Sequence, residues 1–169
     1  MAKASQEVVD FKNWYVQVGA EVGPLRGKEY VSTCPECDKN KWHINRQTGQ
    51  HHCKTCGFEG NHYTFMQWMM DQGTHSGIEE IAAERGVSVA SLQYAEMFKH
   101  GDDWWLPVFN EDRLITLRKW VPPTGTKGEK GYKPGILYNL PKVALEGTFL
   151  YQLATTKKCN KVVLCEGPW

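Results

Sequence analysis

The chain has 169 residues, 41% of them hydrophobic and 23% charged, proportions typical of a folded protein with one domain or two small ones. It contains no run near the roughly 18 apolar residues of a spanning helix. It also begins without the apolar core of a signal peptide, so we expect neither a membrane protein nor a secreted one. A formal net charge of +1 excludes a strong field from the whole molecule, so any polyanionic partner must be held by a local patch.

The N-terminal third predicts a helix followed by a small antiparallel ribbon. Residues 6–18 carry apolar side chains at helical spacing. Alternating patterns predict strands at residues 29–32, 42–46 and 51–53, with a turn at residues 47–50.

Four of the six cysteines form two CxxC pairs within this ribbon. Cys34 and Cys37 are separated from Cys53 and Cys56 by 15 residues, a spacing typical of a structural zinc site. A gap of two residues lets both thiolates of one knuckle face one metal, and the second knuckle completes the tetrahedron. Two disulfides, or four ordinary buried cysteines, are the alternatives. Zinc with four thiolates has no open coordination position, so we expect the metal to stabilise the fold and to take no part in chemistry.

The exposed face of the ribbon is predicted to carry aromatic and cationic side chains that suit single-stranded DNA. These candidate contacts are Trp42, His43, Arg46, His51 and Lys54. The alternative is that Trp42 belongs to the core and that the histidines are merely solvated.

Three further helices are expected after the ribbon. Phe65, Trp68 and Met69 fall at helical spacing and predict a buried helix packed on the ribbon. The segment from Ser76 to Glu79 matches a capping box at the start of the next helix, and Ser88 is expected to cap the third.

The second half of the chain has a different character, which places a domain boundary near residues 96–103. Residues 104–109 and 114–121 predict a hairpin, followed by a basic loop that reaches residue 135. Six basic residues lie between Arg113 and Lys133. An apolar, β-branched run at residues 162–165 is typical of a strand buried on both faces, and Glu166 follows at its carboxyl end, where ligand sites lie in open α/β sheets.

Several segments occur in an order that resembles a known family. They are CPEC at residues 34–37, HHCKTCGFEGN, YTFMQWM, LPVFNEDRLITLRKW, LYNLP and VVLCEGPW. The arrangement resembles bacterial and phage DNA primases, including the primase halves of phage primase–helicase proteins. Bacterial members often have a histidine as one zinc ligand, whereas all four are cysteines here, as in some phage members. The last segment resembles the opening strand and Glu-Gly of a TOPRIM fold.

The resemblance implies an α+β fold in two parts. Residues 1–98 would form a small zinc ribbon with four cysteine ligands and packed helices. Residues 102–169 would form the N-terminal part of an α/β TOPRIM-type primase core. The Asp-x-Asp pair that completes a TOPRIM metal site is absent after Glu166. We therefore expect a piece of a longer primase that binds zinc and does not polymerise by itself.

The activity implied by the resemblance is template-directed RNA primer synthesis from ribonucleoside triphosphates with Mg²⁺, in the cytoplasm of a bacterium or a phage-infected cell. The ribbon would recognise the single-stranded DNA template, and a replicative helicase would be a fused or bound partner. Arg118, Lys119 and Lys133 would lie along the template path, and Glu166 would be the catalytic carboxylate.

Two other classes of function remain open at this point. One is a non-catalytic zinc-ribbon DNA-binding module that acts as a replication or transcription accessory factor. The other is a protein-interaction ribbon that recruits a helicase or polymerase without touching DNA. A titration with labelled single strands separates the second class from the others.

Overall fold

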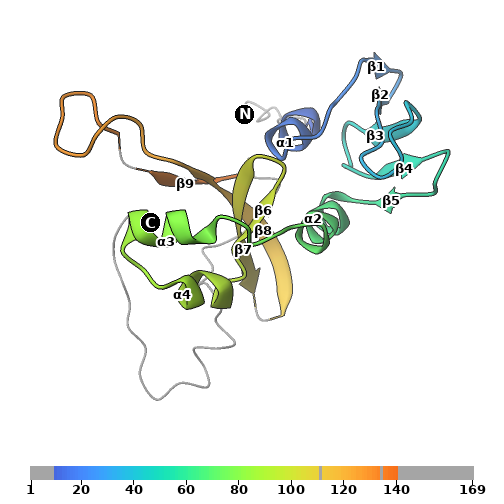
Figure 1. The fold of residues 1–169 in the computed structure, drawn as a ribbon. Coiled ribbons are helices and arrows are strands. Elements are labelled where there is room, and N and C mark those ends of the chain that lie inside the picture. Colours follow the sequence, from blue (N-terminus) through green and yellow to red (C-terminus); the bar gives the residue numbers. More distant parts are fainter. Residues whose placement is uncertain (1–9, 111, 134, 141–169) are drawn as a thin grey trace, which may run out of the picture. The chain divides into compact units, whose positions relative to one another are not determined.

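The computed structural model describes residues 10–110, 112–133 and 135–140 of the chain (Figure 1). The described residues divide into two compact units between Phe65 and Met66. The elements are α1 (Lys12–Gln17), β1 (Leu25–Arg26), β2 (Glu29–Ser32), β3 (Trp42–Asn45), β4 (His51–Cys53), β5 (Glu59–Gly60), α2 (His62–Asp71), α3 (Ile78–Arg85), α4 (Val89–Tyr94), β6 (Phe98–His100), β7 (Asp103–Asn110), β8 (Arg113–Val121) and β9 (Ile136–Asn139).

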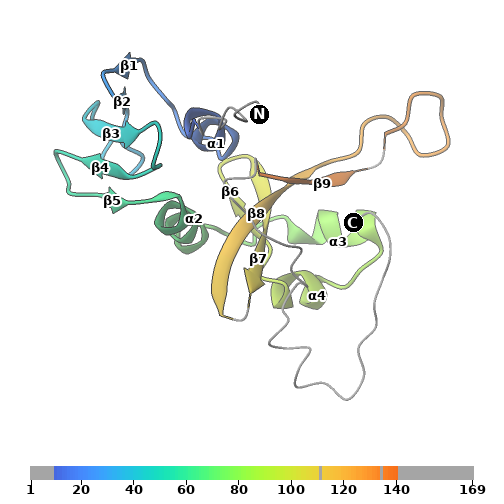
Figure 2. The same cartoon turned by 180° about the vertical axis from the view of Figure 1, so that it is seen from behind.

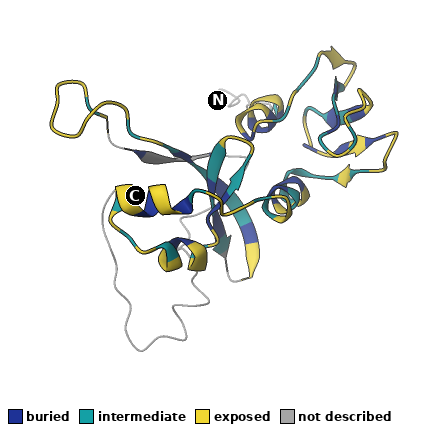
Figure 3. Cartoon of the chain, in the orientation of Figure 1, coloured by how far each residue is buried: buried dark blue, intermediate teal, exposed yellow. Residues whose placement is uncertain are grey.

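The first unit contains a five-stranded antiparallel sheet in the order β1-β2-β3-β4-β5, which confirms the predicted ribbon. Burial alternates along its strands, as expected for a sheet with one covered face (Figure 3). Trp42 pairs with Cys53 across β3 and β4, and His43 pairs with His52. Because neighbours directly opposite each other share a face, the first pair is buried and the second faces outward.

An aromatic core covers the inner face of this sheet. Phe65, from the first turn of α2, stacks on Trp42 with ring centroids 5.5 Å apart and planes 24° apart. Tyr15, from α1, meets Trp42 edge-on at 5.5 Å and donates a hydrogen bond from its hydroxyl to the carbonyl oxygen of Gly49 at 2.7 Å. Both predicted helices place aromatic side chains on the ribbon, although α1 covers only Lys12–Gln17 of the predicted residues 6–18.

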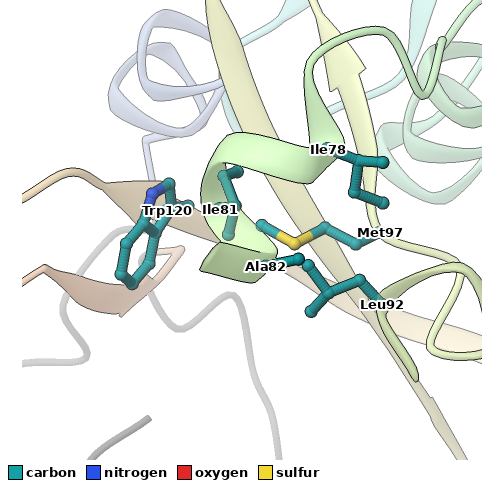
Figure 4. Packing of buried hydrophobic residues seen from close by; sticks show 6 residues of the cluster. All are labelled: Ile78, Ile81, Ala82, Leu92, Met97 and Trp120. Atoms are coloured by element: carbon teal, nitrogen blue, oxygen red, sulfur yellow. The ribbon is translucent and has the colours of Figure 1, made fainter. Parts of the chain in front are cut away.

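The second unit contains a four-stranded antiparallel sheet in the order β6-β7-β8-β9. The paired strands β7 and β8 are the predicted hairpin (Figure 2). Their register shifts between Val108 and Phe109. Helices α3 and α4 pack against this sheet through Ile81, Leu92 and Trp120 (Figure 4). The two helices therefore belong to a core with β8, whereas the predicted zinc domain, residues 1–98, groups them with the ribbon. The domain boundary itself stays a prediction.

The starts of α3 and α4 differ in how they are capped. Gly77 precedes α3 in a left-handed conformation with φ 86°, and no side chain caps this helix. The predicted capping box from Ser76 to Glu79 is therefore wrong, because the helix begins one residue later than that motif requires. The predicted cap of α4 is confirmed, since the backbone N–H of Ser91 donates to Oγ of Ser88 at 3.1 Å.

The loop between β8 and β9 is closed near its base. Thr124 and Lys133 exchange two backbone hydrogen bonds of 3.0 Å, and the residues between them, apart from Tyr132, are exposed. At the other side of the loop, Arg85 donates a hydrogen bond to the carbonyl oxygen of Gly135 at 3.3 Å.

The predicted strand at residues 162–165 lies outside the described residues. None of the described helices has the length and apolar character that crossing a membrane requires.

Candidate metal centre and ribbon surface

The four cysteines of the ribbon gather their sulfur atoms at one point. The Sγ atoms of Cys34, Cys37, Cys53 and Cys56 all lie within 4.8 Å of one another. Among the described residues, no other group of three or more metal-binding side chains comes together in this way. Cys34 and Cys53 are fully buried, Cys37 is half-buried and Cys56 is exposed.

The distances between the sulfur atoms fit a tetrahedral zinc site. Sγ of Cys34 lies 3.7 Å from that of Cys56, and Sγ of Cys37 lies 3.7 Å from that of Cys53. A tetrahedron with Zn–S bonds of about 2.3 Å has edges of about 3.8 Å. Disulfide sulfurs would lie about 2.05 Å apart, so the disulfide alternative is excluded. The four cysteines are thus positioned to bind a zinc ion, as predicted.

The two knuckles share one backbone pattern. The N–H of Asp38 donates to the carbonyl oxygen of Cys34 at 2.9 Å, and the N–H of Gly57 donates to that of Cys53 at 3.0 Å. Asp38 and Gly57 both have positive φ angles, 58° and 77°. Each knuckle therefore turns through a left-handed residue directly after its second cysteine.

The pKa values of Cys34 and Cys53, one thiol from each knuckle, are shifted in opposite directions. Burial raises the pKa of Cys34 to about 12. Burial also acts to raise the pKa of Cys53, but the backbone N–H groups of Cys56 and Thr55 lower it, and the net pKa is about 6. Zinc binds the thiolate form of each cysteine, so loading the site must displace protons, foremost from Cys34.

The outer face of the ribbon carries a row of side chains that crosses four strands. Val31, His43 and His52 lie directly opposite one another on β2, β3 and β4, and Glu59 on β5 continues the row. Nδ1 of His43 forms a hydrogen bond of 3.0 Å with Oε2 of Glu29, its diagonal neighbour on β2. His52 and Glu59 are exposed.

Two of the predicted DNA contacts are not on this face. The prediction that Trp42 and His51 are exposed is wrong, because their side chains are 0% and 4% exposed. Both point to the buried side, like Cys53, since residues two apart on a strand share a face. Arg46 is only half-buried, with a buried Nε that no other described residue hydrogen-bonds. The prediction is confirmed for the exposure of Lys54.

His52 is exposed on the outer face but is absent from the predicted DNA contacts. The signal was present in the alternation of β4, because the inward direction of Cys53 sends His51 inward and His52 outward. The predicted DNA contacts instead include His51, which lies on the buried side of β4.

The predicted basic residues of the second unit have different environments. Lys119 forms an ion pair of 2.6 Å with Asp103, and its Nζ lies 5.6 Å from the ring centroid of Trp105. Arg118, its neighbour on β8, is half-buried and has a buried Nε without a hydrogen-bond partner among the described residues. Lys133 is exposed at the base of the β8–β9 loop. The alternation of the strand places Arg118 and Lys119 on opposite faces of the sheet, so they do not form one patch. The predicted catalytic Glu166 lies outside the described residues.

Comparison with known proteins gives one match. A family model for the CHC2 zinc finger, the zinc ribbon of DnaG, matches residues 3–97, which is more than half of the chain. The matched region contains both knuckles and helices α1 to α4. No curated protein and no solved structure matches the chain.

Proposed function

Because the chain belongs to the CHC2 zinc-finger family of DnaG-type primases, we propose that its ribbon recognises the single-stranded DNA template of a primase. The observation that carries this proposal is the outer face of the ribbon, where His43 and His52 lie side by side above a metal-stabilised sheet. Imidazole rings can stack on bases and hydrogen-bond to their edges.

Two lysines next to the metal centre supply the backbone contacts in this proposal. Lys41 precedes β3 and Lys54 follows β4, and the N–H of Lys54 donates to the carbonyl oxygen of Lys41 at 3.1 Å. Both residues are exposed. Four thiolates around Zn²⁺ carry a net negative charge, which these lysines also help to balance. Their exposed ammonium groups remain available to phosphates.

A binding titration with zinc-loaded full chain tests the proposal. Labelled oligonucleotides should bind weakly and with strong salt dependence, because few phosphates are neutralised. Lys41→Gln with Lys54→Gln should weaken binding to all sequences alike. Arg26→Gln with Lys28→Gln, which removes the same charge from the exposed β1–β2 turn, is the matched control and should have a smaller effect. Absence of any binding by the parent would favour a protein-recruiting ribbon.

The polymerase activity is the second part of the proposal. In the complete enzyme, a TOPRIM-type core would join ribonucleoside triphosphates on the template with Mg²⁺, with Glu166 as the catalytic carboxylate and a helicase as partner. A core that contains all of its carboxylates would supply the charge that Mg²⁺ requires. Glu166→Gln in that enzyme should abolish dinucleotide synthesis and leave template binding nearly unchanged. Normal synthesis by this variant would place the catalytic centre elsewhere.

A further inference from the structure

The hydrogen bond between Glu29 and His43 restricts the chemistry that His43 can present to a ligand. Nδ1 of His43 lies 3.0 Å from Oε2 of Glu29. A carboxylate can only accept hydrogen bonds, so Nδ1 must carry the proton. In the neutral imidazole, Nε2 is then left without a proton and can only accept a hydrogen bond.

The acceptor nitrogen of His43 is available for a ligand. The His43 side chain is only 17% exposed, but its Nε2 is not fully buried. Nε2 of His51, by contrast, is fully buried and has no hydrogen-bond partner among the described residues. Glu29 is also its only hydrogen-bond partner among the residues that the structure describes. The geometry of β3 places the ring on the outer face of the ribbon, beside His52.

We propose that Nε2 of His43, oriented by Glu29, accepts a hydrogen bond from the exocyclic amino group of a template base. Adenine, cytosine and guanine carry such a group, and thymine does not. Thymine offers only its ring N3–H as a donor, so we expect a base with an amino group to be preferred at the template position that meets His43. This inference rests on the proposed function, because it names the chemical group that the same surface recognises.

His52 provides a natural comparison on the same face. It lies directly opposite His43 in the sheet and is exposed, but no hydrogen bond joins its side chain to another described residue. Its imidazole can therefore adopt either tautomer and can donate or accept. A change at His52 should alter affinity without altering the preference for an amino group.

The test compares two oligonucleotides that differ in the amino group alone. Zinc-loaded full chain is titrated with oligodeoxycytidine and with the matched oligomer of pyrimidin-2-one, which is cytosine without its 4-amino group. The parent should bind oligodeoxycytidine about three- to tenfold more tightly, the fold-change that corresponds to one neutral hydrogen bond. His43→Phe keeps the ring shape without an acceptor and should bring this ratio close to one. His52→Phe should leave the ratio unchanged.

A second variant tests whether Glu29 orients the imidazole of His43 or only packs beside it. The amide of Glu29→Gln can donate to Nδ1 as well as accept from it, so Nε2 is no longer held as an acceptor and the ratio should narrow. Bound zinc is measured for each variant as a check on folding. A ratio near one for the parent, or an unchanged ratio in His43→Phe, overturns the inference and leaves the proposed template binding standing. Failure of the parent to bind either oligomer overturns both.

Discussion

The indole nitrogen of Trp42 donates a hydrogen bond to Nδ1 of His51 at 3.2 Å, inside the ribbon. The two rings meet at an interplanar angle of 67° with centroids 5.5 Å apart. The bond fixes the tautomer of His51, because Nδ1 must be the acceptor and Nε2 must carry the proton. The hydrogen bond between Trp42 and His51 thus links β3 to β4 next to Cys53, the strand partner of Trp42.

Replacing Trp42 should therefore destabilise the ribbon. Trp42→Phe removes the donor to His51 and part of a fully buried ring, so we expect the free energy of unfolding to fall by about 1–3 kcal/mol. Denaturant unfolding of the zinc-loaded protein measures this change. His52→Gln, on the exposed side of the same hairpin, should change stability by less than about 0.5 kcal/mol. Equal effects of the two substitutions would contradict the assignment of Trp42 to the core.

Zinc removal should unfold the ribbon. We expect one Zn²⁺ per chain, and a serine at any of the four ligand positions should lower the bound metal well below one equivalent. Metal analysis after dialysis gives the stoichiometry, and circular dichroism during titration with a strong chelator follows the unfolding. Cys159→Ser and Cys165→Ser serve as controls and should retain full zinc content. Full zinc retention in a ligand variant would mean that another side chain replaces the missing thiolate.

The left-handed residues of the knuckles allow a clean test of backbone strain. Gly57 has φ 77°, and a Cβ added there would meet nothing within 4 Å. Gly57→Ala should therefore cost about 1–2 kcal/mol through backbone strain alone. Asp38→Gly, at the equivalent position with φ 58°, should have a small or stabilising effect. Thermal unfolding of both zinc-loaded variants distinguishes these outcomes, and a stabilising Gly57→Ala would refute the argument.

The sequence predicted the metal site better than the surface around it. CxxC spacing is a local constraint, so the ligands and the strands between them follow from nearby residues. The directions of the histidines depend instead on the side of β4 to which Cys53 points. His51 points to the same buried side, and His52 points outward. Likewise, helical spacing identified Phe65 as a buried position but could not identify Trp42 of β3 as its neighbour, because periodicity gives a face and not a partner.

His62 should make stability depend on pH. It packs beside Phe11 and Trp14, and burial lowers its pKa from 6.5 to about 4. The unfolded chain therefore binds more protons between these values. The stability that the neutral ring contributes is complete above pH 6.5 and declines as the pH falls towards 4.

The variant that isolates this effect is His62→Phe. The difference in unfolding free energy between this variant and the parent should shift in favour of the variant by on the order of 2–3 kcal/mol between about pH 7 and pH 4. Loss of zinc at low pH affects both proteins, so the comparison is made at matched zinc occupancy. A difference that does not change with pH would show that the pKa of His62 is the same in the folded and the unfolded chain.

The basic residues of the second unit should contribute unequally to template binding. Lys133 is exposed, whereas Lys119 is already paired with Asp103. Lys133→Gln should therefore reduce DNA affinity and the salt dependence more than Lys119→Gln does. Arg118→Gln, at a half-buried position on the opposite face from Lys119, should have the smallest effect on binding. Salt-dependent titrations of the three single variants give the order, and a dominant Arg118 would place the template on the other face of the sheet.

The β3–β4 hairpin connects the two halves of the metal site. In the folded ribbon its turn holds Cys37 and Cys53 close together, so the hairpin and the metal close the same loop and stabilise each other. Gly49 in this turn has φ 66°, and a Cβ there would collide with the ring of Phe11. A substitution at Gly49 should therefore weaken zinc binding without touching the metal, because strain that opens the hairpin also separates the two pairs of ligands.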